Sequence, residues 1–181
     1  KSAVSVELAK IINGEIISAD SMQVYRGMDI GTAKITKEEM GGIKHYLIDC
    51  LNPDEEFSVA VFQTMAKKAI DEILGKGKIP ILVGGTGFYI NALINDNDFS
   101  SSKRDYAIRE KLKNLLEEKG AEFIYNKLKE YDPEYASTVH QNNTKKVIRA
   151  LEYCLENNEK FSEYNKREKL KEPIYDLNFF V

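Results

Sequence analysis

The chain has 181 residues, of which 43% are hydrophobic and 30% are charged. This composition is typical of a protein with a packed core and a hydrated surface, and no apolar run approaches the roughly 20 residues that span a bilayer. The formal net charge of −3 argues against a protein that coats nucleic acid, but it leaves room for a local basic face. Cys50 and Cys154 lack a second thiol at metal-ligand spacing, which favours buried, reduced thiols and a cytoplasmic location. The lack of a long apolar run predicts no membrane partner.

The first fifty residues contain the patterns of one helix and two strands. Apolar residues recur at helical spacing from Val4 to Ile12, which predicts a helix that ends near Gly14. Residues 15–20 (EIISAD) predict a short buried strand that ends in polar residues. A loop with two glycines follows at 21–34, and residues 45–49 (HYLID) predict a second strand.

The next forty residues repeat this alternation of helix and strand. Apolar residues over 59–74 follow the i, i+3, i+4, i+7 pattern of an amphipathic helix, with Ser58 as a plausible N-cap and Gly75 as its end. The continuous apolar run at 79–83 (IPILV) is typical of a parallel strand buried on both faces. Another helix begins at about Phe88. Alternating helices and strands predict an α/β fold with a parallel sheet.

Beyond Phe99 the pattern changes to charged helices. Three serines at 100–102 predict a linker, and apolar stripes then mark helices over about 108–116, 124–131 and 144–155. Residues 178–181 (NFFV) have the pattern of a strand.

The change to charged helices predicts that the chain is divided into three parts. We predict an α/β core over residues 1–99 and a small helical insert over 100–172. Residues 173–181 are expected to return to the core sheet.

Three groups of residues lie where an open parallel sheet binds its ligand, beyond the carboxyl ends of strands or at the start of a helix. The first is Asp20 to Gln23, which also fits an ordinary loop carboxylate or cap. The second is Gly84 to Gly87, which also fits a plain strand-to-helix turn. The third is Lys1 with Ser2. This pair matches the end of a phosphate-binding loop, GxxxxGK[ST], in which Lys reaches the phosphates and the hydroxyl ligates Mg²⁺.

Basic residues crowd the start of the last predicted helix. Lys145, Lys146 and Arg149 lie in its first turn and a half, where positive charge opposes the helix dipole. Such an arrangement is locally unfavourable but makes a good phosphate site, so it favours an RNA partner. A solvated charged face is the alternative.

Four strings, taken together, resemble one known family. They are EIISADSMQVYRGMDIGTAK at 15–34, HYLIDCLNPDEEFSVAVF at 45–62, ILVGGTGFYINAL at 81–93 and HQNNTKKVIRALEY at 140–153. In content and order they closely resemble the tRNA dimethylallyltransferases. The resemblance implies a P-loop-type three-layer parallel sheet core, with the first strand and most of the phosphate loop absent from this chain. It also makes the phosphate-loop interpretation of Lys1 and Ser2 credible.

The resemblance further implies an activity and roles for individual residues. The dimethylallyl group of dimethylallyl diphosphate would move to the exocyclic N6 amine of the adenosine 3′ of the anticodon in tRNA. Asp20 would accept a proton from that amine, with Thr86 beside it. Lys1 and Ser2 would bind the diphosphate, Ser2 through Mg²⁺. The residues implied to contact tRNA are Asp20, Ser21, Met22, Gln23, Thr86, Lys145, Lys146, Val147, Ile148 and Arg149.

Tyr25, Arg26, Asp29 and Lys34 lie in the same loop as the first string, and we expect them to order that loop rather than take part in chemistry. We expect the protein to be a monomer.

Three other functions stay open. An adenylate isopentenyltransferase would act on a free nucleotide, and a small P-loop phosphotransferase would bind ATP. A non-catalytic RNA-binding protein would have no use for the Lys1–Ser2 pair.

Overall fold

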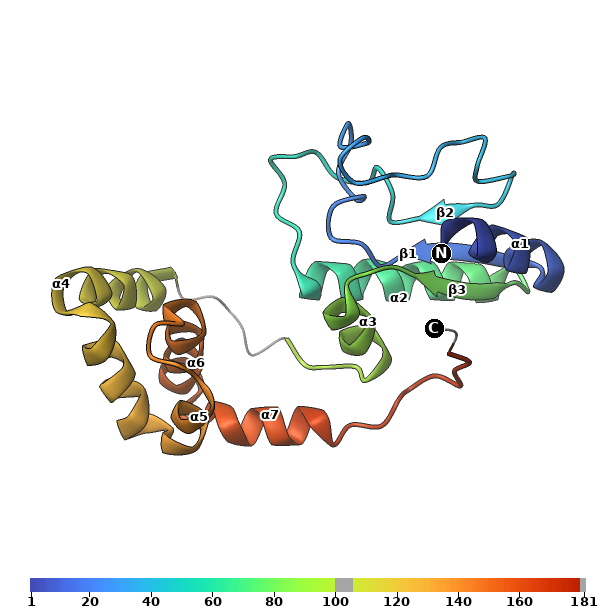
Figure 1. Cartoon of the computed structure of the whole chain (residues 1–181). Coiled ribbons are helices and arrows are strands. Elements are labelled where there is room, and N and C mark those ends of the chain that lie inside the picture. The colour runs from blue at the N-terminus through green and yellow to red at the C-terminus, as the bar shows by residue number, and fades with distance from the viewer. Residues whose placement is uncertain (100–105, 180–181) are drawn as a thin grey trace. The chain divides into compact units, whose positions relative to one another are not determined.

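The structure, a computed structural model, describes residues 1–99 and 106–179. The chain divides into an α/β unit, Lys1–Asn97 with Pro173–Val181, and a helical unit, Asp98–Glu172 (Figure 1). The sequence-based limits at 99/100 and 172/173 fall within two residues of these. The predicted serine linker at 100–102 lies outside the described residues. Among the described residues, no helix combines the length and apolar character that a membrane span requires.

The α/β unit contains a parallel sheet in the order β2-β1-β3. The middle strand, β1 (Gly14–Ser18), pairs with all five residues of β3 (Ile79–Val83) and with β2 (His45–Tyr46). Parallel strands separated by helices confirm the predicted α/β class. However, β2 is shorter than the predicted 45–49, because Leu47 and Asp49 have φ angles of 61° and 53°, outside the extended region.

Helices cover both faces of this sheet. Neighbouring residues of β1 point to opposite faces, so the strand contributes side chains to the core on each face. Ile16 packs against Val6 and Ala9 of α1 (Ser2–Ile12). Ile17 belongs instead to the core that α2 (Val59–Gly75) and α3 (Gly87–Ile94) form on the other face. The predicted cap of α2 is confirmed, since the Ser58 side chain accepts a hydrogen bond from the N–H of Val61.

The strand β3 is more exposed than its sequence predicts. A strand buried on both faces was expected, yet Ile79 is 49% exposed and the other four residues are half-buried. The cause is position: in the described sheet β3 is an edge strand. The chain returns to this unit through Ile174, whose N–H donates to the carbonyl of Ile94. The described part of the predicted last strand, 178–179, is irregular, and 180–181 lie outside the described residues.

The helical unit contains α4 (Tyr106–Tyr131), α5 (Pro133–Thr138), α6 (Thr144–Asn157) and α7 (Phe161–Lys169). Gly120 has φ 82° and ψ 172°, which are not helical values, and it interrupts α4 where the sequence predicts a helix end. The α4 helix therefore has two arms. The core of the helical unit is formed mainly by apolar side chains from α4 and α6, including Leu112, Ile124, Leu128, Val147 and Leu151. Thus each unit has a core of its own.

Candidate active site

The turns that follow β1 and β3 lie against each other. The N–H of Ala19 donates to the carbonyl of Val83 at 2.8 Å, and the carbonyl of Ala19 accepts from the N–H of Thr86 at 3.2 Å. These two hydrogen bonds continue the pairing of β1 and β3 beyond the last residues of the strands. They place Asp20, the next residue, beside the Gly84–Gly87 turn.

The first glycine of that turn is required by packing. A Cβ built on Gly84 would lie 2.1 Å from the carbonyl oxygen of Ala19, which is far inside van der Waals contact. In contrast, a Cβ on Gly85 or on Gly87 would meet no heavy atom within 4 Å beyond its own neighbours in the chain. Gly84 therefore permits the close approach of two backbones, while the other two glycines border open space.

Asp20 is held by the backbone of its own turn. Its Oδ1 accepts hydrogen bonds from the N–H groups of Met22 at 2.8 Å and Gln23 at 3.1 Å. Within residues 1–99 and 106–179, no hydrogen bond is made to its other oxygen, Oδ2. The side chain is half-buried. A capping role and a chemical role are thus compatible, since each uses a different oxygen.

Thr86 and Gln23 differ in how free their side chains are. Thr86 precedes α3 as its N-cap residue, but its hydroxyl makes no capping hydrogen bond. The side-chain amide of Gln23 donates to the carbonyls of Thr32 at 3.0 Å and Ala33 at 3.5 Å. Gln23 therefore ties its turn to the next part of the loop, whereas Met22 is 45% exposed.

Lys34 fixes the rest of this loop, as the sequence predicts. Its buried ammonium donates to the carbonyl of Tyr25 at 2.7 Å and to the carboxylates of Asp29 at 2.7 Å and Asp49 at 2.5 Å. Burial alone would lower the pKa of Lys34, but the hydrogen bonds to the two carboxylates outweigh burial and raise it. A charged lysine with three acceptors holds residues 25–49 in one arrangement.

The start of α1 lies at the same edge of the sheet. A single left-handed residue, Asn13, reverses the chain between α1 and β1. With 11 and five residues, both elements are about 16 Å long. Lys1 and Ser2 are therefore level with the carboxyl end of β1, as Figure 1 shows for the N-terminus. Both side chains are exposed.

The donors at this edge suit a magnesium ion that is held mainly by phosphate. Among the described residues, no group of three or more His, Cys, Asp or Glu side chains could hold a metal ion. Magnesium bound to phosphates needs only one or two protein oxygens and keeps several waters. The exposed hydroxyl of Ser2, at the first residue of a helix, fits that smaller requirement.

The predicted RNA-binding residues of α6 face two directions. Val147 and Ile148 are 1% and 8% exposed and pack in the core of the helical unit. Their side chains lie on the apolar face that periodicity predicts, so they offer RNA no exposed side chain, and the expected RNA contact of these two residues stays a prediction. Lys145 and Lys146 are exposed, and half-buried Arg149 donates to Glu152 at 3.2 Å. The candidate basic face is thus reduced to three residues.

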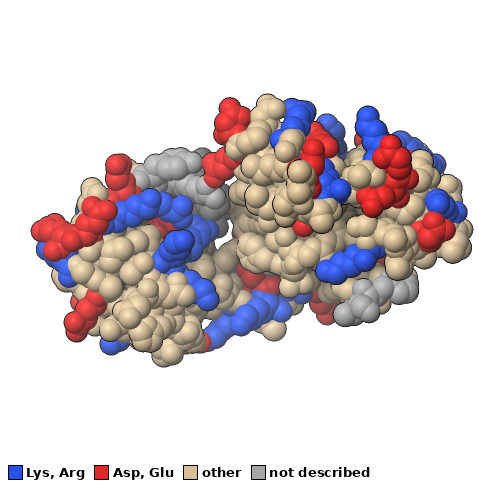
Figure 2. Space-filling model, turned by 45° about the horizontal axis from the view of Figure 1, so that its top comes forward, with Lys and Arg blue, Asp and Glu red and all other residues tan. Residues whose placement is uncertain are grey.

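On the face that Figure 2 shows, Lys and Arg are interspersed with Asp and Glu. This agrees with the small net charge. Any RNA contact would therefore depend on a local group of basic residues.

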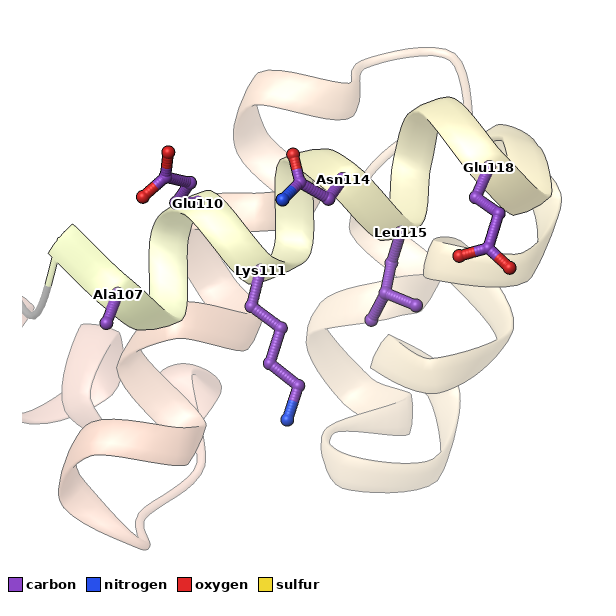
Figure 3. A pocket seen from close by; sticks show the side chains of 6 residues that line it. All are labelled: Ala107, Glu110, Lys111, Asn114, Leu115 and Glu118. Carbon is purple, nitrogen blue, oxygen red and sulfur yellow. The ribbon is translucent and has the colours of Figure 1, made fainter.

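A hollow of about 420 Å³ lies along the first arm of α4, and none of the residues predicted for the site lines it. All its lining side chains come from that one arm: Ala107, Glu110, Lys111, Asn114, Leu115 and Glu118. In Figure 3 these side chains spread from the helix instead of converging on one point. The hollow therefore lacks the convergent polar groups of a small-molecule site.

These features define an α/β protein whose candidate site lies at the carboxyl edge of a parallel sheet. Residues 23–181 match the model of the IPP transferase family. The chain belongs to that family.

Individual relatives agree. The chain is 51% identical over 175 residues to a tRNA dimethylallyltransferase of Oceanobacillus iheyensis, covering 97% of this chain and 56% of the relative. The crystal structure of a tRNA isopentenylpyrophosphate transferase from Bacillus halodurans is 50% identical, with a TM-score of 0.56 over 87% of this chain and 52% of that one. A eukaryotic dimethylallyltransferase acting on tRNA is 36% identical, with a TM-score of 0.81 over 94% of this chain and 42% of that one. The chain thus spans about half the length of these relatives.

Proposed function

We propose that this chain is the part of a tRNA dimethylallyltransferase that joins a dimethylallyl group to the N6 amine of the adenosine 3′ of the anticodon. The observation that carries the proposal is the meeting of the Asp20 turn with the Gly84–Gly87 turn at the edge where α1 begins. The names of the relatives support the same activity. A monomeric, cytoplasmic enzyme with a P-loop-type core is part of this proposal.

The reaction needs a base near a weak nucleophile. The adenine N6 lone pair is delocalised into the ring, so the amine attacks the allylic carbon only as it loses a proton. As the N–C bond forms, the C–O bond to diphosphate breaks and its electron pair leaves with the diphosphate. Asp20 accepts the proton on Oδ2, while Oδ1 stays bonded to the turn. A positioned base contributes about 10²- to 10⁴-fold.

The leaving group needs positive charge at the other end of the candidate site. Lys1 and the free N–H groups of the first turn of α1 bind the departing diphosphate oxygens. Ser2 would supply one oxygen ligand to Mg²⁺, which would neutralise diphosphate charge when bound. These groups act more strongly in the transition state than before it, because negative charge grows on the leaving oxygen.

The target base must leave its stack to reach this edge, at a cost of a few kcal/mol that is smaller in an anticodon loop. Thr86 borders the flipped base through its uncapped hydroxyl, and Ser21 and Met22 border it from the Asp20 turn. Gln23 serves mainly to hold that turn, because its amide is engaged by the loop. Residues 100–172 form the tRNA-binding insert, with Lys145, Lys146 and Arg149 on RNA phosphates.

The test is a labelling assay with the purified protein, labelled dimethylallyl diphosphate, Mg²⁺ and unmodified tRNA. We expect label on the tRNA at the adenosine 3′ of the anticodon. Label on free AMP but not on tRNA would identify an adenylate isopentenyltransferase instead. Phosphoryl transfer from ATP without prenyl transfer would indicate a phosphotransferase. RNA binding with no transfer of any kind would leave only the non-catalytic alternative.

A further inference from the structure

Two arginines from different helices meet on one buried carboxylate in the helical unit. Glu152 of α6 is 0% exposed. Its Oε2 accepts a hydrogen bond from Nη2 of Arg109 on α4 at 2.7 Å and another from Nη1 of Arg149 on α6 at 3.2 Å. Because both donors reach the same oxygen atom, the two guanidinium groups are neighbours.

The charges of this cluster do not cancel. Two guanidinium groups stay charged at every physiological pH, and one carboxylate balances only one of them. The two arginine side chains are 30% and 37% exposed, so the excess charge reaches the surface while Glu152 does not. Each guanidinium has five N–H donors in a planar fork, and Glu152 takes one donor from each. Apart from the buried Nε of Arg109, the remaining donors suit an anion with several oxygens.

The surrounding packing fixes the cluster. The α4 and α6 helices share the core that contains Leu112 and Leu151, so their relative position is set within one unit. Lys145 lies one helical turn before Arg149, on the same face of α6, and is exposed. The cluster thus extends the basic face of α6 onto α4. Local sequence pattern gave no sign of this, because Arg109 is 40 residues from Arg149.

We propose that Arg109 and Arg149 bind one phosphate group of the RNA backbone, with Glu152 as the residue that positions both. Paired guanidinium forks match the geometry of phosphate oxygens. This inference rests on the proposed function and adds Arg109 and Glu152 to it. The competing explanation is a purely structural ion pair that fastens α4 to α6.

The experiment measures binding of an anticodon stem-loop RNA to the purified protein over a series of salt concentrations. We expect Arg109→Gln to weaken binding about tenfold and to reduce the slope of log K against log salt by about one. Arg109→Lys keeps the charge, so the slope should stay as in wild type while affinity is still reduced about threefold. Arg167→Gln is the matched control, since Arg167 also pairs with a glutamate, Glu159, at 2.5 Å in the same unit. It should leave the RNA affinity within about twofold of wild type, because its charge is outside the cluster.

The outcomes separate the two proposals. Wild type that transfers the prenyl group while Arg109→Gln binds RNA unchanged overturns the arginine site alone. Equal losses for Arg109→Gln and Arg167→Gln overturn it as well, because they would reflect total charge. Wild type that neither binds the stem-loop nor modifies tRNA overturns both proposals. If Arg109→Gln unfolds, as a thermal melt would show, Arg109→Lys decides: wild-type affinity overturns the inference, and weaker binding at an unchanged slope supports it.

Discussion

Asp20 in the α/β unit and Glu152 in the helical unit each accept two hydrogen bonds, but from different kinds of donor. Asp20 is half-buried and accepts from two backbone N–H groups within three residues of itself. Glu152 is fully buried and accepts from two arginine side chains, one of them 43 residues away. Each carboxylate has one oxygen without a hydrogen bond among the described residues, but that of Glu152 is buried, whereas Asp20 is half-buried and leaves Oδ2 available for chemistry. Glu152 instead serves to hold basic groups.

The comparison implies a division of labour that experiments can test. Changes at the edge of the sheet should alter the rate of the chemical step more than RNA affinity. Changes at the α4–α6 cluster and on the basic face of α6 should alter RNA affinity more than the chemical step.

Asp20→Asn should produce the largest effect. The amide can still accept the hydrogen bonds from Met22 and Gln23, so the turn is kept, but it cannot accept a proton. We expect single-turnover prenyl transfer to slow about 10²- to 10⁴-fold, with tRNA affinity changed by less than about threefold. Asp54→Asn, at an exposed loop carboxylate outside the candidate site, should have wild-type rates. A parallel fall in rate and affinity for Asp20→Asn would remove its role as base.

Gly84→Ala tests the close approach on which the candidate site depends. The new Cβ would lie 2.1 Å from the carbonyl oxygen of Ala19, so the ends of β1 and β3 must separate. We expect a loss of about 3 kcal/mol in the free energy of unfolding, measured by urea denaturation, and a slower transfer rate. Gly85→Ala is the matched control, because its Cβ would meet open space. Equal effects of the two changes would show that packing against Ala19 is unimportant.

The strands and the turns of this edge could be predicted because their signals are local. The apolar run at 79–83 and the glycines after it occupy consecutive positions, and Asp20 directly follows a strand. Two details escaped the pattern. Leu47 and Asp49 have positive φ angles, which side-chain type does not reveal, so β2 was predicted too long. The exposure of β3 depends on its neighbours in the sheet, which its own sequence cannot specify.

The helical unit was harder to predict, since its buried groups include polar ones. The α7 helix was missed because its buried positions, Ser162 and Glu168, are not apolar. Ser162 is buried because both its N–H and its hydroxyl donate to the carboxylate of Asp132. For Val147 and Ile148, helical periodicity indicated the core correctly, whereas the family resemblance suggested RNA contact. Arg109 carried no local signal, because its partner lies on another helix.

Glu15 tests whether the α/β unit also depends on a buried carboxylate. Burial alone would raise its pKa, but hydrogen bonds from Lys78, Tyr46 and Lys76 outweigh burial and lower the pKa from 4.5 to about 2. A folded-state pKa below the unfolded one gives stability that is complete above about pH 4.5 and is lost as the pH falls through about 2. Glu15→Gln should therefore flatten the fall in stability across this window, measured by urea unfolding at several pH values.

Glu72→Gln provides the comparison for Glu15. Glu72 also has a pKa lowered to about 2, by hydrogen bonds from Lys76, Lys44 and Tyr46, but its side chain is 46% exposed. Solvent screening should make its contribution smaller, since exposed ion pairs contribute little. A larger pH effect for Glu72→Gln than for Glu15→Gln would contradict the importance of burial.

Lys146→Glu should have the smallest effect and should fall on RNA binding alone. Lys146 is exposed on the first turn of α6, so reversing its charge should not disturb the core. We expect anticodon stem-loop affinity to fall about fivefold and the salt dependence of binding to decrease, with the single-turnover rate at saturating tRNA unchanged. Lys169→Glu makes the same charge change on α7 and should have less effect on affinity. Equal losses would mean that RNA responds only to the net charge of the protein. A reduced rate at saturating tRNA would contradict the contrast between the two units, because a residue of the basic face would then affect the chemical step.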